Sequence, residues 1–165
     1  MTKTEENLKI IFENECQASQ RYRAFSKRAR KEGYPNIARL FKLASEIERI
    51  HAQNKLQALN MVGTTLENLN SVIARERNEN KITYPSVLKQ AISDNHKGRF
   101  IIENNIKSKE AHSKLYFAAL AALNEGKDLN TGELYLCPFC GNILTDKPDK
   151  NCTICTAPAS KFIAV

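Results

Sequence analysis

The stretch IARLFKLASEIERIHA (37–52) decides the fold of this 165-residue chain. Its apolar residues recur every three or four positions, and Glu48 and His51 fall in the same row as Phe41 and Ala44. Such spacing predicts an amphipathic helix that carries a carboxylate and an imidazole on its core-facing side. A carboxylate in that position is costly unless something pairs with it.

A second helical row precedes this stretch, beyond a turn at Gly33-Tyr34-Pro35, where glycine can end one helix and proline can begin the next. Glu15 and His51 each lie 18 residues from Gly33. Two antiparallel helices therefore bring them to one level, about 27 Å from the turn. The row consists of Leu8, Ile11, Glu15, Ala18, Tyr22, Phe25 and Ala29.

The chain then repeats this plan. A shift of 61 residues places Glu15 on Glu76 and His51 on His112. The second copy predicts two more amphipathic helices, so the chain is expected to form a four-helix bundle. Six candidate ligands for a carboxylate-bridged dimetal site then share one layer: Glu15, Glu48, His51, Glu76, Glu79 and His112.

The alternative is that each acidic group is solvated and each histidine is a satisfied core residue. The chain has three histidines, and two of them occupy equivalent positions of the repeat, which favours the metal layer over coincidence. The third, His96, falls near a predicted tip between helices and is expected at the surface.

Composition changes at Gly126, after which prolines and cysteines become frequent. We expect a bundle over 1–125, a linker over 126–132 and a small domain over 133–165. Two Cys-x-x-Cys knuckles, Cys137/Cys140 and Cys152/Cys155, can supply four thiolates to one tetrahedral metal ion. The spacing suits iron and zinc alike.

The net charge of +7 raises the question of nucleic acid, and RYRAFSKRARK (21–31) is strongly basic. That segment also carries a helical apolar row, so a solvated helix face is the preferred interpretation. The sequence has no apolar run of 18 residues and begins with polar MTKTEENLK, which predicts a cytoplasmic protein without a membrane partner. The fifth cysteine, Cys16, is expected to be a buried small residue rather than a ligand.

Four segments resemble the rubrerythrin family: ENECQASQRYRAF (13–25), ARKEGYPNIARLFKLASEIERIHA (29–52), ARERNENKITYP (74–85) and CPFCGNILTDKPDKNCTICTAPASKF (137–162). The resemblance implies an all-α ferritin-like four-helix bundle, followed by a rubredoxin-like (or zinc-ribbon-like) metal domain. It matches the six layer residues to di-iron ligands and favours iron in the four-cysteine site. It also implies a catalytic role for Glu79, which would change coordination, and for Tyr22 and Tyr84 beside the centre. Core packing is the alternative for both tyrosines.

By the same resemblance, the expected activity is that of a peroxidase-type oxidoreductase. Electrons from a reductase or rubredoxin would pass through the thiolate-bound iron to the bundle iron, which would reduce hydrogen peroxide to water in oxidative-stress defence. The family also implies a homodimer.

One ligand departs from the pattern. The repeat and the family both place a bridging glutamate at position 109, where this chain has lysine. Either Lys109 weakens metal loading and leaves a mononuclear or empty site held by salt bridges, or a neutral buried lysine coexists with two metals. If the bundle site is disabled, the alternative functions are a one-centre electron carrier and a zinc-bearing interaction module.

Overall fold

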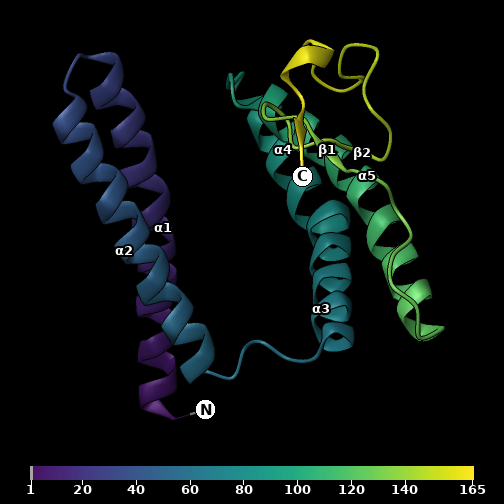
Figure 1. Cartoon of the computed structure of the whole chain (residues 1–165), viewed down its shortest axis with the longest axis horizontal. Coiled ribbons are helices and arrows are strands. Elements are labelled where there is room, and N and C mark those ends of the chain that lie inside the picture. Colours follow the sequence, from purple (N-terminus) through teal and green to yellow (C-terminus); the bar gives the residue numbers. More distant parts are fainter. Residues whose placement is uncertain (1) are drawn as a thin grey trace. The chain divides into compact units, whose positions relative to one another are not determined.

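The computed structural model describes residues 2–165 and divides the chain into two compact units. The first ends at Gly63 and the second runs from Thr64 to Val165. The described chain contains five α-helices, three short strands and two short segments of π- and 3₁₀-helix. Figure 1 shows their order along the chain. The predicted fold class, a helical ferritin-like chain with a small C-terminal metal domain, is confirmed. Within residues 2–165, no helix is both long and apolar enough to cross a membrane.

The first unit is a helical hairpin of α1 (Lys3–Lys31) and α2 (Pro35–Ala58), as predicted. Thr2 and Glu5 form a capping box at the start of α1. At the turn, Gly33 takes a φ of 86°, a left-handed conformation that suits glycine, and Pro35 opens α2. The sequence therefore encodes both the end of the first helix and the start of the second.

Small side chains line the contact between α1 and α2. The Ser19 and Ser45 hydroxyls each donate to the other residue's carbonyl oxygen at 2.9 Å, and Ser26 donates to Ala38 at 2.7 Å. Hydroxyls can reach the opposite backbone only where the helices approach closely, which small residues permit. The buried residues of this seam are Ser19, Ser26 and Ala29 on α1 and Ala38, Ser45 and Ala52 on α2.

The outer faces of the hairpin are of two kinds. The basic residues of the segment 21–31 are exposed, which agrees with a solvated helix face. Large apolar side chains of α2 are exposed as well; Leu40 and Leu43 keep 63% and 59% of their accessible surface. A hairpin taken by itself thus leaves apolar surface uncovered, as expected for a part of a larger bundle.

The second unit contains α3 (Thr65–Asn78), a π-helical segment η1 (Glu79–Thr83), α4 (Tyr84–Ser93) and α5 (Arg99–Asn124). Helix α3, η1 and α4 follow one another without a loop, and α5 packs against all three. Thr64 and Glu67 form a second capping box at the start of α3. The predicted repeat of a helical hairpin is thus present. In the second copy, the π-helical segment η1 interrupts the first of the two long helical stretches.

The tail forms a three-stranded antiparallel sheet in the order β2-β1-β3. The strands are β1 (Tyr135–Leu136), β2 (Ile143–Leu144) and β3 (Ile163–Ala164), and a 3₁₀ turn, η2 (Ala159–Lys161), precedes β3. Tyr135 pairs with Leu144 on one side and with Ala164 on the other. Residues 125–134 join α5 to this sheet, while the domain limits at 125 and 133 stay a prediction.

Candidate metal centres

The first candidate centre lies in the α1–α2 hairpin. Glu15 comes from α1, and Glu48 and His51 come from one face of α2, as their three-residue spacing predicts. The three side chains offer ligand atoms that all lie within 4.8 Å of one another. His51 points its Nδ1 at the carboxylates, 3.7 Å from Glu48 and 4.0 Å from Glu15.

The donor set of this centre fits a metal ion. One buried oxygen of Glu15, Oε2, has no hydrogen-bond partner within the described chain, while its other oxygen accepts from the Lys55 ammonium at 2.7 Å. A buried carboxylate oxygen without a partner is a position that an ion or a water molecule could fill. Glu76 Oε2, in the second unit, is also buried and without a partner in the described chain. Two carboxylates and an imidazole suit several first-row divalent ions, iron included. Glu15, Glu48 and His51 would hold such an ion.

The second candidate centre, between α3, η1 and α5, already contains a cation. The Lys109 ammonium donates to Glu76 at 2.8 Å and to Glu79 at 2.6 Å. Arg75 donates to the other oxygen of Glu79 at 2.8 Å. The three side chains of Glu76, Glu79 and Lys109 keep only 13–19% of their accessible surface. The two carboxylates are therefore neutralised from within the chain.

The protonation of this cluster follows from its hydrogen bonds. The bond from Lys109, followed by the bond from Arg75, holds the pKa of Glu79 below its ordinary value. Burial alone would lower the pKa of Lys109, but its hydrogen bonds to Glu76 and Glu79 outweigh burial and raise the pKa. These hydrogen bonds favour the charged form of Lys109. The alternative of a neutral Lys109 beside two bound metals stays a prediction.

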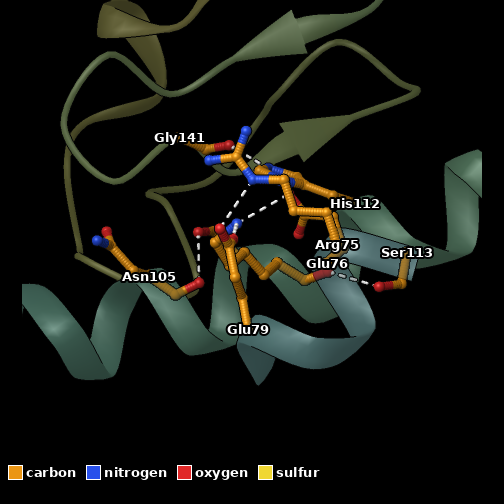
Figure 2. A network of polar contacts seen from close by, with 9 residues as sticks. Arg75, Glu76, Glu79, Asn105, His112, Ser113 and Gly141 are labelled. Atoms are coloured by element: carbon orange, nitrogen blue, oxygen red, sulfur yellow. Dashed lines mark hydrogen bonds and ion pairs between the residues drawn. The ribbon is translucent and has the colours of Figure 1, made fainter. Parts of the chain in front are cut away.

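His112 lies on α5, one turn after Lys109, and contacts the tail domain. Its Nε2 is 2.6 Å from the carbonyl oxygen of Gly141, which directly follows the first cysteine knuckle (Figure 2). Because a carbonyl only accepts, Nε2 carries the proton and a neutral ring keeps its lone pair on Nδ1. This tautomer suits a ligand that binds through Nδ1. Within residues 2–165, however, His112 joins no group of three ligand atoms with Glu76 and Glu79.

The four tail cysteines meet in one cluster, as their spacing predicts. Their sulfur atoms lie within 4.8 Å of one another, and both Cys137–Cys155 and Cys140–Cys152 are 3.6 Å apart. A tetrahedral ion with bonds of about 2.3 Å needs sulfurs about 3.8 Å apart, so the cluster fits iron or zinc. None of the five cysteines, all of which lie in the described chain, forms a disulfide.

Backbone and side-chain donors stabilise negative charge in this cluster. The Asn142 amide lies 3.9 Å from the sulfur of Cys152. Burial would raise the pKa of Cys152, but backbone N–H groups of Cys155 and Ile154 outweigh it and lower the pKa to about 7. In contrast, burial raises the pKa of Cys140. A metal ion would offset that cost by binding the thiolate.

The structure also gives the positions of the two candidate tyrosines, of His96 and of the fifth cysteine. Tyr84 is the first residue of α4, and the Lys109 ammonium lies 5.5 Å from the centre of the Tyr84 ring. Tyr22 lies half-buried on α1, with its ring centre 6.1 Å from that of Phe25, which keeps 41% of its accessible surface. His96 is exposed, as predicted. Cys16 is half-buried, and burial followed by the charge of Glu15 raises its pKa, as befits an inert thiol.

The π-helical segment η1 was not predicted, although the repeat contains its signal. Tyr22 follows Glu15 by seven residues, whereas Tyr84 follows Glu76 by eight. One additional residue within a helix is accommodated by a π-bulge, a feature common at functional sites. The bulge begins at Glu79 and brings the Tyr84 ring close to Lys109.

Comparison with known proteins agrees with this geometry. The family described as Rubrerythrin matches residues 6–120. Rubrerythrin-2 of Clostridium acetobutylicum is 31% identical, with 98% of this chain and 96% of that protein covered. Nigerythrin of Nitratidesulfovibrio vulgaris is 30% identical, with 98% and 86% covered. A solved structure of nigerythrin, titled as fully reduced and all ferrous, aligns at a TM-score of 0.56 and 28% identity, with 100% of this chain and 88% of that chain covered.

The match to the relatives extends beyond the helices into the cysteine domain, so it includes both kinds of candidate centre. Along this chain, the parts follow in the order of the Glu-x-x-His helix, its repeat and the four cysteines. The chain belongs to the rubrerythrin family.

Proposed function

We propose that this protein is a non-haem iron peroxidase of the rubrerythrin type, which reduces hydrogen peroxide to water. The reaction consumes one peroxide, two electrons and two protons and releases two waters. Bound iron would supply the one-electron steps, in the four-cysteine cluster and in the centre of Glu15, Glu48 and His51. An external reductase or rubredoxin would supply the electrons, and the nigerythrin relative, titled all ferrous, supports iron as the metal.

The observation that carries this proposal is that one chain contains both a four-cysteine cluster and a carboxylate–histidine centre. The first suits an ion that only exchanges electrons, because four thiolates fill its coordination. The second keeps room for a small molecule, since three protein ligands leave coordination positions open. The hydrogen bond from His112 to Gly141 gives the cysteine domain a direct contact with α5. Catalytic roles for Glu79, Tyr22 and Tyr84, a homodimer and a cytoplasmic location are parts of the same proposal.

The test is peroxide consumption by iron-loaded protein with a reductase and NADH under anaerobic conditions. We expect steady consumption that Glu48→Gln and Cys137→Ser each abolish, while Cys16→Ser retains it. Loss in both variants distinguishes a two-centre peroxidase from free-iron chemistry.

A second function is favoured by one observation, the salt bridges of Lys109 to Glu76 and Glu79. If these keep metal out of the bundle, the protein is a one-centre electron carrier. Red, iron-loaded protein that is oxidised and reduced without consuming peroxide would establish the carrier. Colourless zinc protein would instead indicate an interaction module and refute both redox functions.

A further inference from the structure

The family implies two metal ions in the bundle. The two halves of this chain differ in how well their side chains could bind such ions. In the first unit, three ligand atoms converge. Oε2 of Glu15 in this unit and Oε2 of Glu76 in the second both lack a partner within the described residues, so the unpartnered oxygen does not distinguish the two units. In the second unit, a lysine side chain lies between the carboxylates of Glu76 and Glu79. Lys109 occupies the repeat position of Glu48, so one ligand has been replaced by a cation.

A lysine also touches the first centre, but in a different manner. Lys55 bonds a single carboxylate, Glu15, through one oxygen only, and it lies four residues beyond His51, where it replaces no member of the ligand set. Lys109 bonds both acidic residues of its centre. Glu15 and Glu76 each keep one oxygen without a partner in the described chain, whereas Lys109 and Arg75 engage both oxygens of Glu79. An ion bound by both Glu76 and Glu79 would therefore have to displace a cation from Glu79.

Charge leads to the same conclusion. The ammonium of Lys109 and the guanidinium of Arg75 already balance the two carboxylates. A divalent ion placed there would be repelled at short range in a site largely closed to solvent. It would also find one protein ligand fewer, because lysine at position 109 offers no carboxylate.

From this geometry we infer that the bundle binds one metal ion per chain, held by Glu15, Glu48 and His51, and that the Lys109 ammonium takes the place of the second ion. This inference rests on the proposed iron chemistry and deepens it. It makes Lys109 an internal substitute for a metal, which fixes Glu76 and Glu79 whether or not the first centre is loaded. Glu79 would then have no second ion to bind, so this inference replaces its proposed change of coordination with a structural role.

The test is Mössbauer spectroscopy of the full-length protein loaded with ⁵⁷Fe, which separates thiolate-bound iron from iron bound by oxygen and nitrogen. We expect the two classes in a ratio of about one to one, against about one to two for a di-iron site beside a four-cysteine site. Total metal analysis gives the independent count, about two ions per chain rather than about three. Neither measurement needs a variant to fold.

Variants then assign the effect to Lys109. Lys109→Glu restores the repeat and should raise the oxygen- and nitrogen-bound iron about twofold. Lys109→Met, which removes the charge without adding a ligand, and Lys107→Glu, an equal charge change at an exposed position of the same helix, should leave it unchanged. Two bundle ions in the unmodified protein, or no gain in Lys109→Glu, would overturn the inference and leave the peroxidase proposal intact. Iron in the four-cysteine cluster alone would refute both.

Discussion

His112 on α5 and Gly141 in the cysteine domain are joined by a hydrogen bond of 2.6 Å. The acceptor belongs to the turn that carries Cys140, and the donor ring belongs to the repeat position of a predicted metal ligand. The turn that carries Cys140 is therefore hydrogen-bonded directly to α5. This contact contributes to the docking of the small domain, whose strand β2 also packs against α5. The linker, residues 125–134, has no regular structure.

Replacing His112 by phenylalanine should loosen that docking. The variant keeps an aromatic ring of similar size but cannot donate to the Gly141 carbonyl, and a lost hydrogen bond costs about 1 kcal/mol. We expect faster hydrogen exchange in residues 137–144 and faster proteolysis in the linker, with helix content unchanged. His96→Phe is the matched control, because His96 is exposed and its ring accepts from the Gly98 N–H of the same turn. Equal protection in the two variants would show that the contact does not hold the domain.

The salt bridges of Lys109 should stabilise the metal-free protein. Lys109→Met leaves Glu76 and Glu79 close together without their shared cation, although Arg75 still neutralises Glu79. Removing one partner of a largely buried ion pair is strongly destabilising, and with that partial compensation we expect roughly 1–3 kcal/mol. Urea unfolding of metal-free protein measures the loss. Lys107→Met, at an exposed position, should change the unfolding free energy by less than about 0.5 kcal/mol.

The same ion pairs predict a pH window for this stabilisation. The pKa of Glu79 is lowered from 4.5, so its contribution is present above that pH and is lost as the pH falls through the folded value. The pKa of Lys109 is raised from 10.5, so its contribution is present below that pH and is lost at still higher pH. The difference in unfolding free energy between the metal-free protein and Lys109→Met should be largest between these limits and vanish in acid. A difference that persists in strong acid would assign it to packing of the lysine stem instead.

Thiol accessibility should report the state of the four-cysteine cluster. In metal-loaded protein, the four clustered sulfurs are blocked, and half-buried Cys16 should react slowly with a thiol reagent. Removing the metal with a strong chelator should expose all five thiols, because none of these described residues is in a disulfide. The Cys16→Ser variant checks the assignment, since it should show no reactive thiol before chelation and four after it. Fast reaction of every thiol before chelation would mean that the cluster holds no metal.

The sequence was sufficient for the parts of the fold that depend on periodicity and turn chemistry. Gly33 and Pro35 predicted the hairpin, and the three-residue spacing placed Glu48 and His51 on one helical face. The paired knuckles predicted the cysteine cluster for the same reason, because ligand spacing is a local property.

Other features depend on contacts that periodicity does not encode. The repeat identified Lys109 as a departure, but only the structure shows its ammonium between Glu76 and Glu79. The contact of His112 with Gly141 joins residues 29 positions apart in the sequence. The π-bulge at Glu79 requires comparing two copies residue by residue, since apolar rows continue on both sides of it.

The hydroxyl seam between α1 and α2 gives the last prediction. Ser45 donates to the Ser19 carbonyl and its own carbonyl accepts from Ser19, so the two residues form a reciprocal pair across the hairpin. Ser45→Ala should cost about 1 kcal/mol, because it removes one hydrogen bond and keeps the close approach. Ser45→Leu should cost more, roughly 1–3 kcal/mol or above, because the larger side chain forces the helices apart.

The loss should extend to metal binding, since Glu15 lies on the other helix from Glu48 and His51. Separating α1 from α2 pulls one ligand away from the other two, whereas Ser45→Ala leaves all three in place. We therefore expect Ser45→Leu to lose bundle iron and retain thiolate-bound iron, and Ser45→Ala to retain both. Ser86→Leu, at an exposed position of α4, is the control for added apolar bulk. Retention of bundle iron in Ser45→Leu would show that the first centre does not depend on the spacing of the hairpin.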